Sequence, residues 1–469
     1  MSDASVKLTE GSVMRHVTVM SFTASIGIMA IYLVDLFDIF FISLLGHEQV
    51  AAAAGYATTV LFFISALNIG LSVGAGALVA RELGAGRLSS ARDYTTASLV
   101  IALAIGVVLP IVTMPFLPFF VGLIGATGAV ADMAVGYLQI VVPATGLSAM
   151  SMVCVAAIRA NGAASWAMYP SLLGALINLI MDPLLIFGLG LDLYGAALAT
   201  VMARIGTFAL AIHAIIVRFK LVAPPNWERL GQNAKDIMEY AMPALIANVA
   251  TPVGTAIVTR FITNYGSEAV AGIAIVGRLA PVVFSVVNAL SGSIGAIIGQ
   301  NYGAERFERV HEAYYAALKF LAVYVGIAIA LLMLFQDAIA YAFGAKGLAK
   351  EIIFIYCGPF ALVAFFNGAL FVSSAAFNNL GHPRLAPLFN WAKNTIGLVF
   401  FVALGTYFFG FLGLPYGLLA NAALFALIGH VVSLRIIRNL SPERKPDERV
   451  VFPERDSHTA MSHSESLHS

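Results

Sequence analysis

Apolar stretches long enough to cross a lipid bilayer follow one another along almost the whole chain. A membrane-spanning α-helix needs about 20 apolar residues, and the sequence offers such runs at 15–45, 50–80, 94–115, 131–157, 167–190, 194–217, 236–264, 268–299, 314–336, 351–378, 386–411 and 414–437. A transmembrane barrel would need alternating strands of about ten residues instead. Because helices satisfy their own backbone groups in lipid, the sequence predicts an all-α polytopic membrane protein with twelve transmembrane helices.

The composition agrees with a membrane protein and excludes several functional classes. Of the 469 residues, 60% are hydrophobic and 11% are charged, whereas a soluble domain has about 45–50% and about 25%. The sequence contains neither a phosphate-binding GxxxxGK[ST] motif nor an HExxH motif. We therefore expect neither an ATP-driven pump nor an enzyme, and we expect the lipid bilayer, and no nucleic acid, as a partner.

Basic residues indicate which ends of the spans face the cytoplasm. They lie before the first span, at the even-to-odd connections and after the last span, and the opposite connections are nearly free of them apart from Lys346 and Lys350. Lys and Arg are enriched in cytoplasmic loops. Both termini are therefore predicted to be cytoplasmic, in the cytoplasmic (inner) membrane of a bacterium or archaeon.

The second half of the chain repeats the first. Residues 46–57 align with 266–277 at an offset of 220, and residues 71–91 align with 290–310 at an offset of 219. Since each copy contains six spans, both copies start on the same side of the membrane, and the repeat is parallel. The sequence predicts two six-helix lobes around a central cavity.

The repeat also sets the domain boundaries. We expect a cytoplasmic N-terminus (1–14), an N-lobe (15–217), a polar and basic cytoplasmic linker (218–235), a C-lobe (236–437) and a disordered cytoplasmic tail (438–469). Pro224 and Pro225 discourage a continuous helix through the linker. The tail is too polar to bury a core.

Charged residues inside the spans need a reason, because each costs about 2.5–3.5 kcal/mol at the centre of a helix on insertion scales. The deep carboxylates all lie in the first half, whereas the second half carries only basic residues: the full set is Asp35, Asp38, Asp182, Arg204, Arg260, Arg278 and Lys393. This asymmetry predicts that the acidic chemistry belongs to the N-lobe.

Polar side chains from several N-lobe spans fall at a similar membrane depth. Asn178 and Asp182 are four residues apart and share a helical face. From their glycine-marked ends, Asp182 lies about 12 Å deep, Thr200 about 15 Å and Asp35 about 16 Å, and Tyr137 enters from the same side. Carboxylate, amide and hydroxyl oxygens can hold a proton or a hard cation. The alternative is that they only bridge helices by hydrogen bonds.

The role of three further residues can be interpreted in two ways. Asp38 is either a second carboxylate of this group or an outward partner for a cation, and Lys393 either reaches substrate in the C-lobe or pairs across helices. Arg278, like the other buried arginines, either lines the substrate cavity or ties its helix to polar neighbours. We count Tyr137, Asp38, Arg278 and Lys393 as candidate residues of a substrate cavity.

Several of these motifs resemble those of the multidrug and toxic compound extrusion (MATE) family. They are the parallel repeat, the segments GAGALVARELGAGR and GAIIGQNYGAER, and NLIMDP with YGAALAT. The resemblance covers nearly the whole membrane region. The second lobe shows no acidic pair, so the sequence is more similar to the DinF-like branch than to the NorM-type branch.

The resemblance implies specific roles for the N-lobe residues. The cation site would consist of Asp35, Asn178, Asp182 and Thr200, with the backbone carbonyl of Ala196 and the hydroxyl of Tyr137 nearby. Members of the branch often have a proline early in helix one, which is missing here. Bending of that helix would then rely on Ser21, Ser25 or Gly27, or not occur.

The implied function is efflux by antiport. We expect H⁺ or Na⁺ to enter at Asp35 and Asp182, with no cofactor, and to drive the export of cationic or amphiphilic drugs by alternating access in a monomer. A lipid-linked oligosaccharide flippase of the same superfamily is one alternative, although twelve spans and an acidic first lobe speak against it. A membrane channel is an alternative from another class, and no filter-like repeat supports it.

Overall fold

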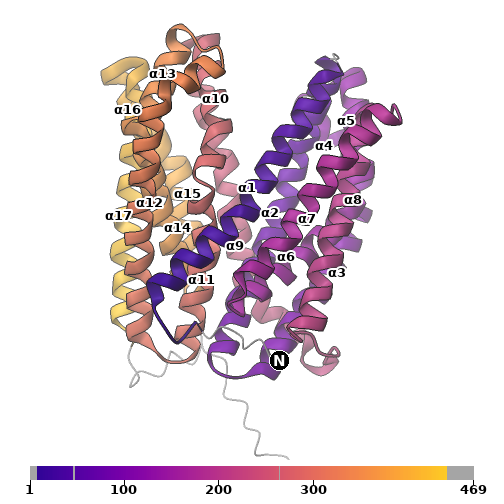
Figure 1. Ribbon diagram of the computed structural model, residues 1–469, viewed down its shortest axis with the longest axis vertical. Helices are drawn as coiled ribbons and strands as arrows, with labels where there is room; N and C mark the ends of the chain where they lie inside the picture. The colour runs from indigo at the N-terminus through magenta and orange to yellow at the C-terminus, as the bar shows by residue number, and fades with distance from the viewer. Residues whose placement is uncertain (1–7, 46–47, 263–264, 441–469) are drawn as a thin grey trace, which may run out of the picture.

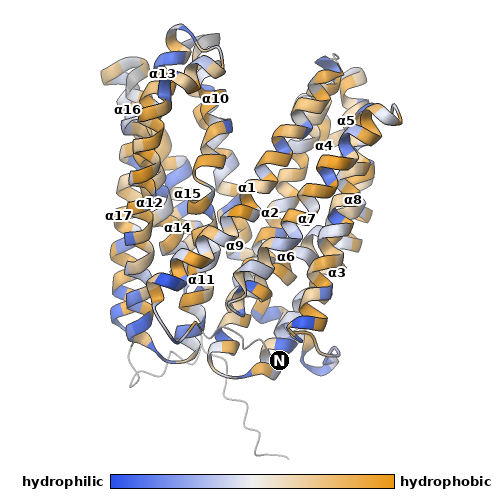
Figure 2. Ribbon diagram, in the orientation of Figure 1, coloured by the Kyte–Doolittle hydropathy of each residue, from blue (hydrophilic) through white to orange (hydrophobic). Residues whose placement is uncertain are grey.

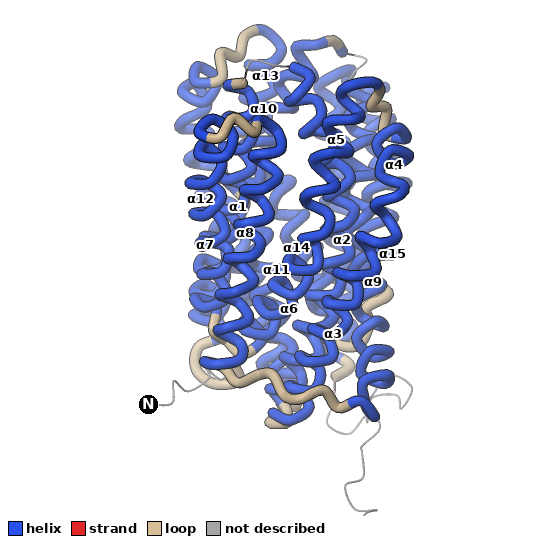
Figure 3. The backbone as a smooth tube through the Cα atoms, turned by 90° about the vertical axis from the view of Figure 1, so that its right-hand side faces the viewer, coloured by secondary structure: helices blue, strands red, loops and turns tan. Residues whose placement is uncertain are grey.

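Helices arranged in two bundles make up the computed structural model, which describes residues 8–45, 48–262 and 265–440 (Figure 1). Within these ranges the chain is helical with short loops at both ends of the bundles and no strand (Figure 3). In this part of the chain, eleven helices are long and apolar enough to span a membrane, or twelve if one bent pair counts as a single span. The all-α polytopic fold with its predicted number of spans is therefore confirmed.

The N-lobe contains the helices that the first six apolar runs predict. Pro115 and Pro143 interrupt two of its spans, because proline cannot donate the backbone hydrogen bond that a helix needs. Its helices are α1 (Val13–Leu44), α2 (Glu48–Gly84), α3 (Leu88–Thr113), α4 (Leu117–Leu123), α5 (Gly128–Val141), α6 (Thr145–Ala160), α7 (Ala164–Pro183) and α8 (Asp192–His213).

The C-lobe repeats this order with its own breaks. The bent pair is α10 and α11, which meet at Phe284 with an angle of 44° shortly after Pro281, and Pro359 separates α13 from α14. The helices are α9 (Trp227–Ile262), α10 (Ser267–Val283), α11 (Ser285–Gly303), α12 (Phe307–Ala342), α13 (Gly347–Cys357), α14 (Val363–Asn379), α15 (Leu385–Ala392), α16 (Leu398–Phe409) and α17 (Gly413–Arg438).

The main differences from the predicted boundaries lie where helices continue beyond the apolar runs. Helix α9 begins at Trp227, so it takes up much of the predicted linker 218–235. Hydropathy marks only the part of a helix that lies in lipid, so it does not detect the polar first turns of α9. The third span likewise continues through α4 to Leu123 rather than ending at 115. The predicted disordered tail falls almost entirely outside the described residues.

The two bundles approach each other at one end and diverge at the other (Figure 1). We call the end where they meet, at the bottom of the figure, the closed end, and the opposite end the open end. Helix α1 crosses between the bundles: near its start, Phe22 packs edge-on against Phe320 and Tyr324 of α12, and farther along, Gly27 lies against Met168 and Ser171 of α7. A single helix thus contacts both lobes.

At the closed end, α2 and α11 cross so closely that only glycine fits. A Cβ atom at Gly84 would overlap the carbonyl oxygen of Gln300, and a Cβ atom at Gly303 would overlap the carbonyl oxygen of Arg81. These two contacts are related by the repeat, because Gly303 is equivalent to Gly84 and Gln300 is equivalent to Arg81, each at the offset of 219. The lobes therefore meet here through a pseudo-symmetric pair of backbone contacts.

The distribution of apolar and polar residues on the surface is the one expected for a protein that spans a membrane. Large apolar side chains such as Val108, Ile111 and Leu334 are exposed along the flanks, and polar residues gather at the closed end (Figure 2). There, Arg87 binds Glu82 through two contacts of 2.7 and 2.9 Å, and this bond raises the pKa of the Arg87 guanidinium.

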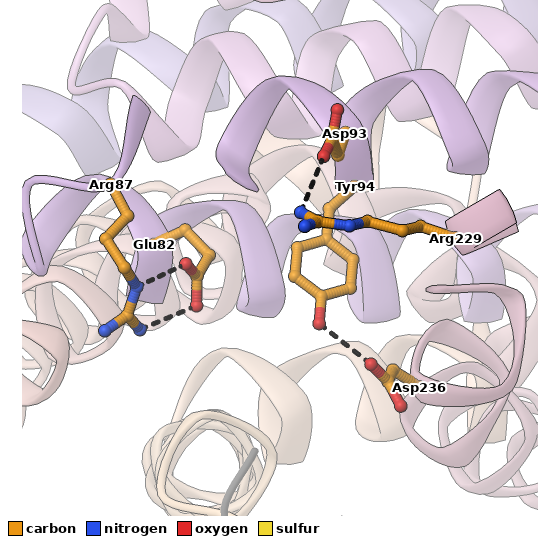
Figure 4. A network of polar contacts seen from close by, with 6 residues as sticks. All are labelled: Glu82, Arg87, Asp93, Tyr94, Arg229 and Asp236. Atoms are coloured by element: carbon orange, nitrogen blue, oxygen red, sulfur yellow. Dashed lines mark hydrogen bonds and ion pairs between the residues drawn. The ribbon is translucent and has the colours of Figure 1, made fainter. Parts of the chain in front are cut away.

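A second group of polar contacts at the closed end fixes the start of α9 to α3. The Tyr94 hydroxyl donates to Asp236 at 2.8 Å, and Arg229 lies 4.0 Å from Asp93 (Figure 4). The shortened linker is held as well, because the Arg92 side chain donates to the carbonyl of Lys220 at 2.6 Å. These contacts attach the connection between the lobes to the N-lobe.

Candidate cation site

Helix α7 carries two polar side chains into the interior of the N-lobe. Asn178 and Asp182 are one turn apart and are 3% and 0% exposed. A π-helical turn, Leu184–Gly188, follows directly after Pro183. Such turns occur frequently at functional sites. The structure thus places Asn178 and Asp182 on one buried face of the helix, as their spacing predicts.

The third member of this group is Asp38 of α1. With the Asn178 amide oriented so that its nitrogen faces the two carboxyl groups, this nitrogen lies 2.6 Å from Asp182 Oδ2 and 2.8 Å from Asp38 Oδ1. Asp38 and Asp182 are also hydrogen-bonded to each other. Helices α1 and α7 are thereby joined by an acidic group, which we call the carboxyl pair (Asp38 and Asp182).

The carboxyl pair places two acidic groups around one amide nitrogen. Two ionised carboxylates only accept hydrogen bonds, so a proton on one of them would let it donate to the other. The second oxygen of Asp182, Oδ1, is buried and has no hydrogen-bond donor among the described residues. The pair therefore has a carboxylate oxygen to which a proton or a cation could bind.

Thr200, Ala196 and Tyr137 lie beside the carboxyl pair, as predicted. The Thr200 hydroxyl donates to the carbonyl of Ala196 at 3.0 Å, and the Tyr137 and Thr200 hydroxyls are hydrogen-bonded. Tyr137 also interacts electrostatically with Asp38, Asp182 and Arg204. These residues add hydroxyl oxygens from α5 and α8 to the carboxyl and amide groups from α1 and α7.

Arg204 is a positive charge beside this group, because it interacts electrostatically with Tyr137. Its Nη1 atom donates to the carbonyl of Val141 at 3.0 Å, at the end of α5. Arg204 therefore connects its helix to a polar neighbour, which is one of the two interpretations that the sequence allowed for the arginines inside the spans.

Asp35 lies one helical turn from Asp38 and is exposed rather than part of the hydrogen-bonded group. It interacts electrostatically with Asp38 and with Tyr32, and the Tyr32 hydroxyl accepts a bond of 3.4 Å from Asn288 of α11. The helix-one carboxylate that meets Asn178 and Asp182 is thus Asp38, where the sequence analysis expected Asp35. Asp35 lies beside Tyr32 instead, the residue through which α1 is bonded to the C-lobe.

The sequence contains a signal for the contact of Asp38 with Asn178, and a cation-binding role of Asp35 stays a prediction. Asp38 lies eight residues before Gly46, just as Asp182 lies eight residues before Gly190, so both should reach the same depth, about 12 Å from their helix ends. Asp35 lies a full turn deeper. Tyr32 and Asn288 were not predicted at all, because nothing in the sequence indicates which residues of different lobes meet.

The two basic candidates of the C-lobe lie apart from the carboxyl pair. Arg278 is exposed on α10, and Lys393 is half-buried at the start of a π-helical turn, where its carbonyl accepts a 3.0 Å bond from Asn421. No hydrogen bond or ion pair joins either side chain to Asp38 or Asp182 in the described part of the chain. Their predicted role in a substrate cavity stays a prediction.

At the repeat offset of 219, Asn178 and Asp182 correspond to Gly397 and Phe401. The acidic group therefore has no counterpart in the C-lobe, and nearby polar residues on this span include amides. Asn390 and Asn394 bond to carbonyls within their own helical segment, and Asn394 also packs against Gly254 of α9. Among the residues that the structure describes, no group of three or more His, Cys, Asp or Glu side chains has a geometry for a metal ion. The assignment to the DinF-like branch stays a prediction.

Comparison with known sequences gives one family and several relatives. The sequence pattern of the MatE family matches residues 23–184 and 243–403. An FAD transporter of Shewanella oneidensis is 28% identical over 89% of this chain and 93% of its own length. The multidrug export protein MepA of Staphylococcus haemolyticus is 23% identical over 93% of this chain and 96% of its own length.

Comparison with solved structures gives the same fold. A multidrug resistance MATE family transporter of the MOP superfamily in an outward-facing conformation has a TM-score of 0.87 at 22% identity, covering 94% of this chain and 99% of the other. A mutant of the Vibrio cholerae MATE transporter VcmN has a TM-score of 0.87 at 20% identity, covering 91% and 98%.

Proposed function

Because the chain belongs to the MatE family of membrane transporters, we propose that it is an antiporter that exchanges H⁺ or Na⁺ for organic molecules and thereby exports drugs. Its relatives include a multidrug export protein, which supports this cargo class. Transport by such a protein needs a group whose charge changes with ion binding, since an ion drives a conformational change only by binding one state more tightly than the other.

The carboxyl pair is the observation that carries this proposal. Asp182 is buried and Asp38 is half-buried, and both lie within hydrogen-bonding distance of the Asn178 amide, between α1 and α7. Ionisation of both carboxyl groups would place two like charges side by side in a medium of low dielectric, which is unfavourable. We propose that the pair either binds a proton or binds Na⁺ through its carboxylate oxygens and the Thr200 hydroxyl, in which case the Asn178 amide turns so that its oxygen faces the ion.

Helix α1 would pass this change to the rest of the protein. Its end near Asp38 belongs to the carboxyl pair, whereas its start packs on the C-lobe through Phe22. A shift of α1 against α7 therefore changes the contact between the lobes. In the proposed cycle, ion binding favours release of cargo at the open end, and ion release at the closed end favours the return.

The direction of transport depends on which end faces the cytoplasm. We propose that the closed end does, because Arg87, Arg92, Arg306 and Arg309 lie there and cytoplasmic loops are rich in such residues. The structure would then represent the state that is open to the outside. A neighbour in structure is described as outward-facing, which supports the same assignment.

Asp35 has a different proposed role from the carboxyl pair. Because it is exposed and interacts with Tyr32, which bonds across to the C-lobe, we propose that it attracts cationic cargo between the lobes. The carboxyl pair would then bind the coupling ion, and Asp35 would select the cargo.

A second class of cargo is favoured by one relative. The FAD transporter matches 89% of this chain, and FAD carries negative phosphates. In that case Lys393 and Arg278 of the C-lobe would meet the phosphates, and Asp35 would oppose binding. Binding of FAD and of a cationic dye to the purified protein distinguishes a dinucleotide cargo from a cationic one. If the cargo is a dinucleotide, replacement of Lys393 by Gln weakens the binding of FAD and leaves the binding of the dye unchanged.

Flux measurements in proteoliposomes test the antiport itself. Efflux of a fluorescent cation is measured at fixed pH with and without Na⁺, and then with a pH gradient and no Na⁺. We expect one of the two gradients to accelerate efflux, and a protonophore to abolish the effect of the pH gradient. Cargo movement that ignores both gradients would contradict antiport, and ion conductance without cargo would indicate a channel.

A further inference from the structure

The short segment that precedes α1 is buried at the closed end of the molecule. Leu8 and Thr9 are 0% and 7% exposed, although they precede the first helix and carry no span themselves. The Leu8 side chain belongs to a buried cluster that also contains Val13 of α1, Ala164 of α7 and Ile297 of α11. The segment therefore packs where the two lobes meet.

Side chains around the turn between α11 and α12 bind the backbone of this segment. The Leu8 N–H donates to Gln300 Oε1 at 3.0 Å, and the Leu8 carbonyl accepts bonds from Asn301 at 3.2 Å and Arg309 at 3.3 Å. Arg306 donates to the Thr9 carbonyl at 2.6 Å. Three backbone groups of this turn thus have side-chain partners, which we call the segment site (Gln300, Asn301, Arg306 and Arg309).

Further contacts hold the segment site itself in position. The Asn301 amide oxygen accepts a bond of 3.1 Å from Arg309, and its nitrogen also donates to the carbonyl of Ile297. Removal of the peptide would take away the hydrogen-bond partners of Gln300 Oε1 and Arg306, and buried polar groups are costly when unpaired. The motif GQNYGA, which contains Gln300 and Asn301, therefore binds a part of the same chain.

Gln300 also connects the segment to the opposite lobe. Its Nε2 atom donates to the carbonyl of Ala160, at the end of α6, at 2.6 Å, while its Oε1 atom accepts from Leu8. Since the amide group is planar, fixing its oxygen also fixes the direction of its nitrogen. The bond between the lobes thus depends on an amide that the N-terminal segment orients.

We propose that Leu8 and Thr9 act as a latch that orients Gln300 and thereby holds the lobes together at the closed end. Opening of this end must break the bond between Gln300 and Ala160, and a protein without the latch should break it more readily. This inference uses the alternating access of the proposed function, but it does not depend on the coupling ion or on the cargo.

Distances between spin labels on the two lobes test the latch. Labels replace the exposed residues Ser89, at the start of α3, and Glu308, at the start of α12. A second pair at Thr127 and Lys346 reports on the open end. Distance distributions are measured in lipid nanodiscs without ion gradient or cargo, so failure of ion coupling would not affect them.

Two deletions form a matched comparison. Removal of residues 2–9 takes away the latch, whereas removal of residues 2–7 leaves Leu8 and Thr9 in place. We expect the population with a long distance between positions 89 and 308 to rise about two- to tenfold in the first variant, as for the loss of one hydrogen bond, and to stay unchanged in the second. Equal distributions in both would overturn the proposal.

Gln300→Glu provides an independent variant. The carboxylate still accepts from the Leu8 N–H but cannot donate to the Ala160 carbonyl, so the latch stays bound while the bond between the lobes is lost. We expect the same opening as in the deletion of residues 2–9, with a shorter distance at the open end. An unchanged closed end in this variant would show that the bond between Gln300 and Ala160 does not hold the lobes.

Discussion

Single residues decide how the N-lobe can respond to an ion. Asp38, Asp182 and Asn178 lie within hydrogen-bonding distance of one another, and one oxygen of Asp182 stays without a donor among the described residues. A buried pair of carboxyl groups cannot readily carry two negative charges. In the proposed function the pair exchanges a proton or a small cation one at a time, and neighbouring Asp35 interacts with cargo.

Replacement of Asp35 tests this division of roles. In Asp35→Asn we expect the affinity for a monovalent cationic cargo to fall about two- to fivefold, the effect of one partly exposed ion pair, with unchanged dependence on the ion gradient. Equilibrium binding of a cationic dye to the purified protein measures the affinity. A neutral compound of similar size serves as control and should bind equally well to both proteins.

Part of the candidate cation site could be predicted from the sequence. Asn178, Asp182, Thr200 and Tyr137 were predicted because spacing along a helix fixes their face and depth. The choice between Asp35 and Asp38 depends on how α1 is rotated about its axis, which follows from packing against α7 and the C-lobe. Sequence spacing within one helix does not contain this rotation, although the equal distances of Asp38 and Asp182 from their glycines indicate that they lie at a common depth.

At the scale of helices, close crossings fix the arrangement of the lobes. Gly84 and Gly303 allow α2 and α11 to touch through their backbones at the closed end. Helix α1 contains no break from Val13 to Leu44, and Ser25 donates to the Phe22 carbonyl at 2.8 Å. The missing proline therefore leaves α1 as one continuous element in this state.

Alanine at the crossing glycines should separate α2 from α11. Gly84→Ala and Gly303→Ala each place a methyl group against a backbone carbonyl, and overpacking of this kind costs about 1–3 kcal/mol. We expect a lower midpoint of thermal unfolding in detergent for both variants. Gly326→Ala in α12 is the control, because no atom lies within 4 Å of the added group, and it should unfold at the same or a higher temperature. Equal midpoints for all three would contradict the close crossing.

The spans themselves were largely predictable, and their ends were not. Continuous apolar runs give the helices because lipid leaves the backbone no other partner. The first turns of α9 and the extension through α4 escaped prediction because they lie beyond the apolar runs or after a proline. The parallel repeat predicted two lobes, but not the manner in which α1 reaches from one to the other.

At the scale of the whole molecule, charge and shape agree on an orientation. Basic residues lie at the closed end, and the bundles diverge at the other end (Figure 1). With the closed end in the cytoplasm, cargo would leave towards the outside and the coupling ion would enter from there. The latch at Leu8 and Thr9 and the carboxyl pair would then act at opposite ends of the same helix, α1.

Cysteine labelling in intact cells tests this orientation. A membrane-impermeant maleimide should react with Thr127→Cys and Lys346→Cys, at the open end, and not with Ser89→Cys or Glu308→Cys, at the closed end. The two native cysteines, Cys154 and Cys357, are buried, so the unmodified protein is the background control. The reverse pattern would mean that the closed end faces outwards.

The most direct test of ion coupling compares four proteins in the same proteoliposomes. Exchange of cargo against an imposed H⁺ or Na⁺ gradient is measured for the unmodified chain, Asp38→Asn, Asp182→Asn and Asp35→Asn, with cargo binding measured in parallel. We expect Asp38→Asn and Asp182→Asn to lose the gradient-driven component by at least about tenfold, equivalent to about 1.4 kcal/mol, while still binding cargo, and Asp35→Asn to retain it. Gradient-driven exchange at the unmodified rate in both Asp38→Asn and Asp182→Asn would contradict the assignment of coupling to the carboxyl pair.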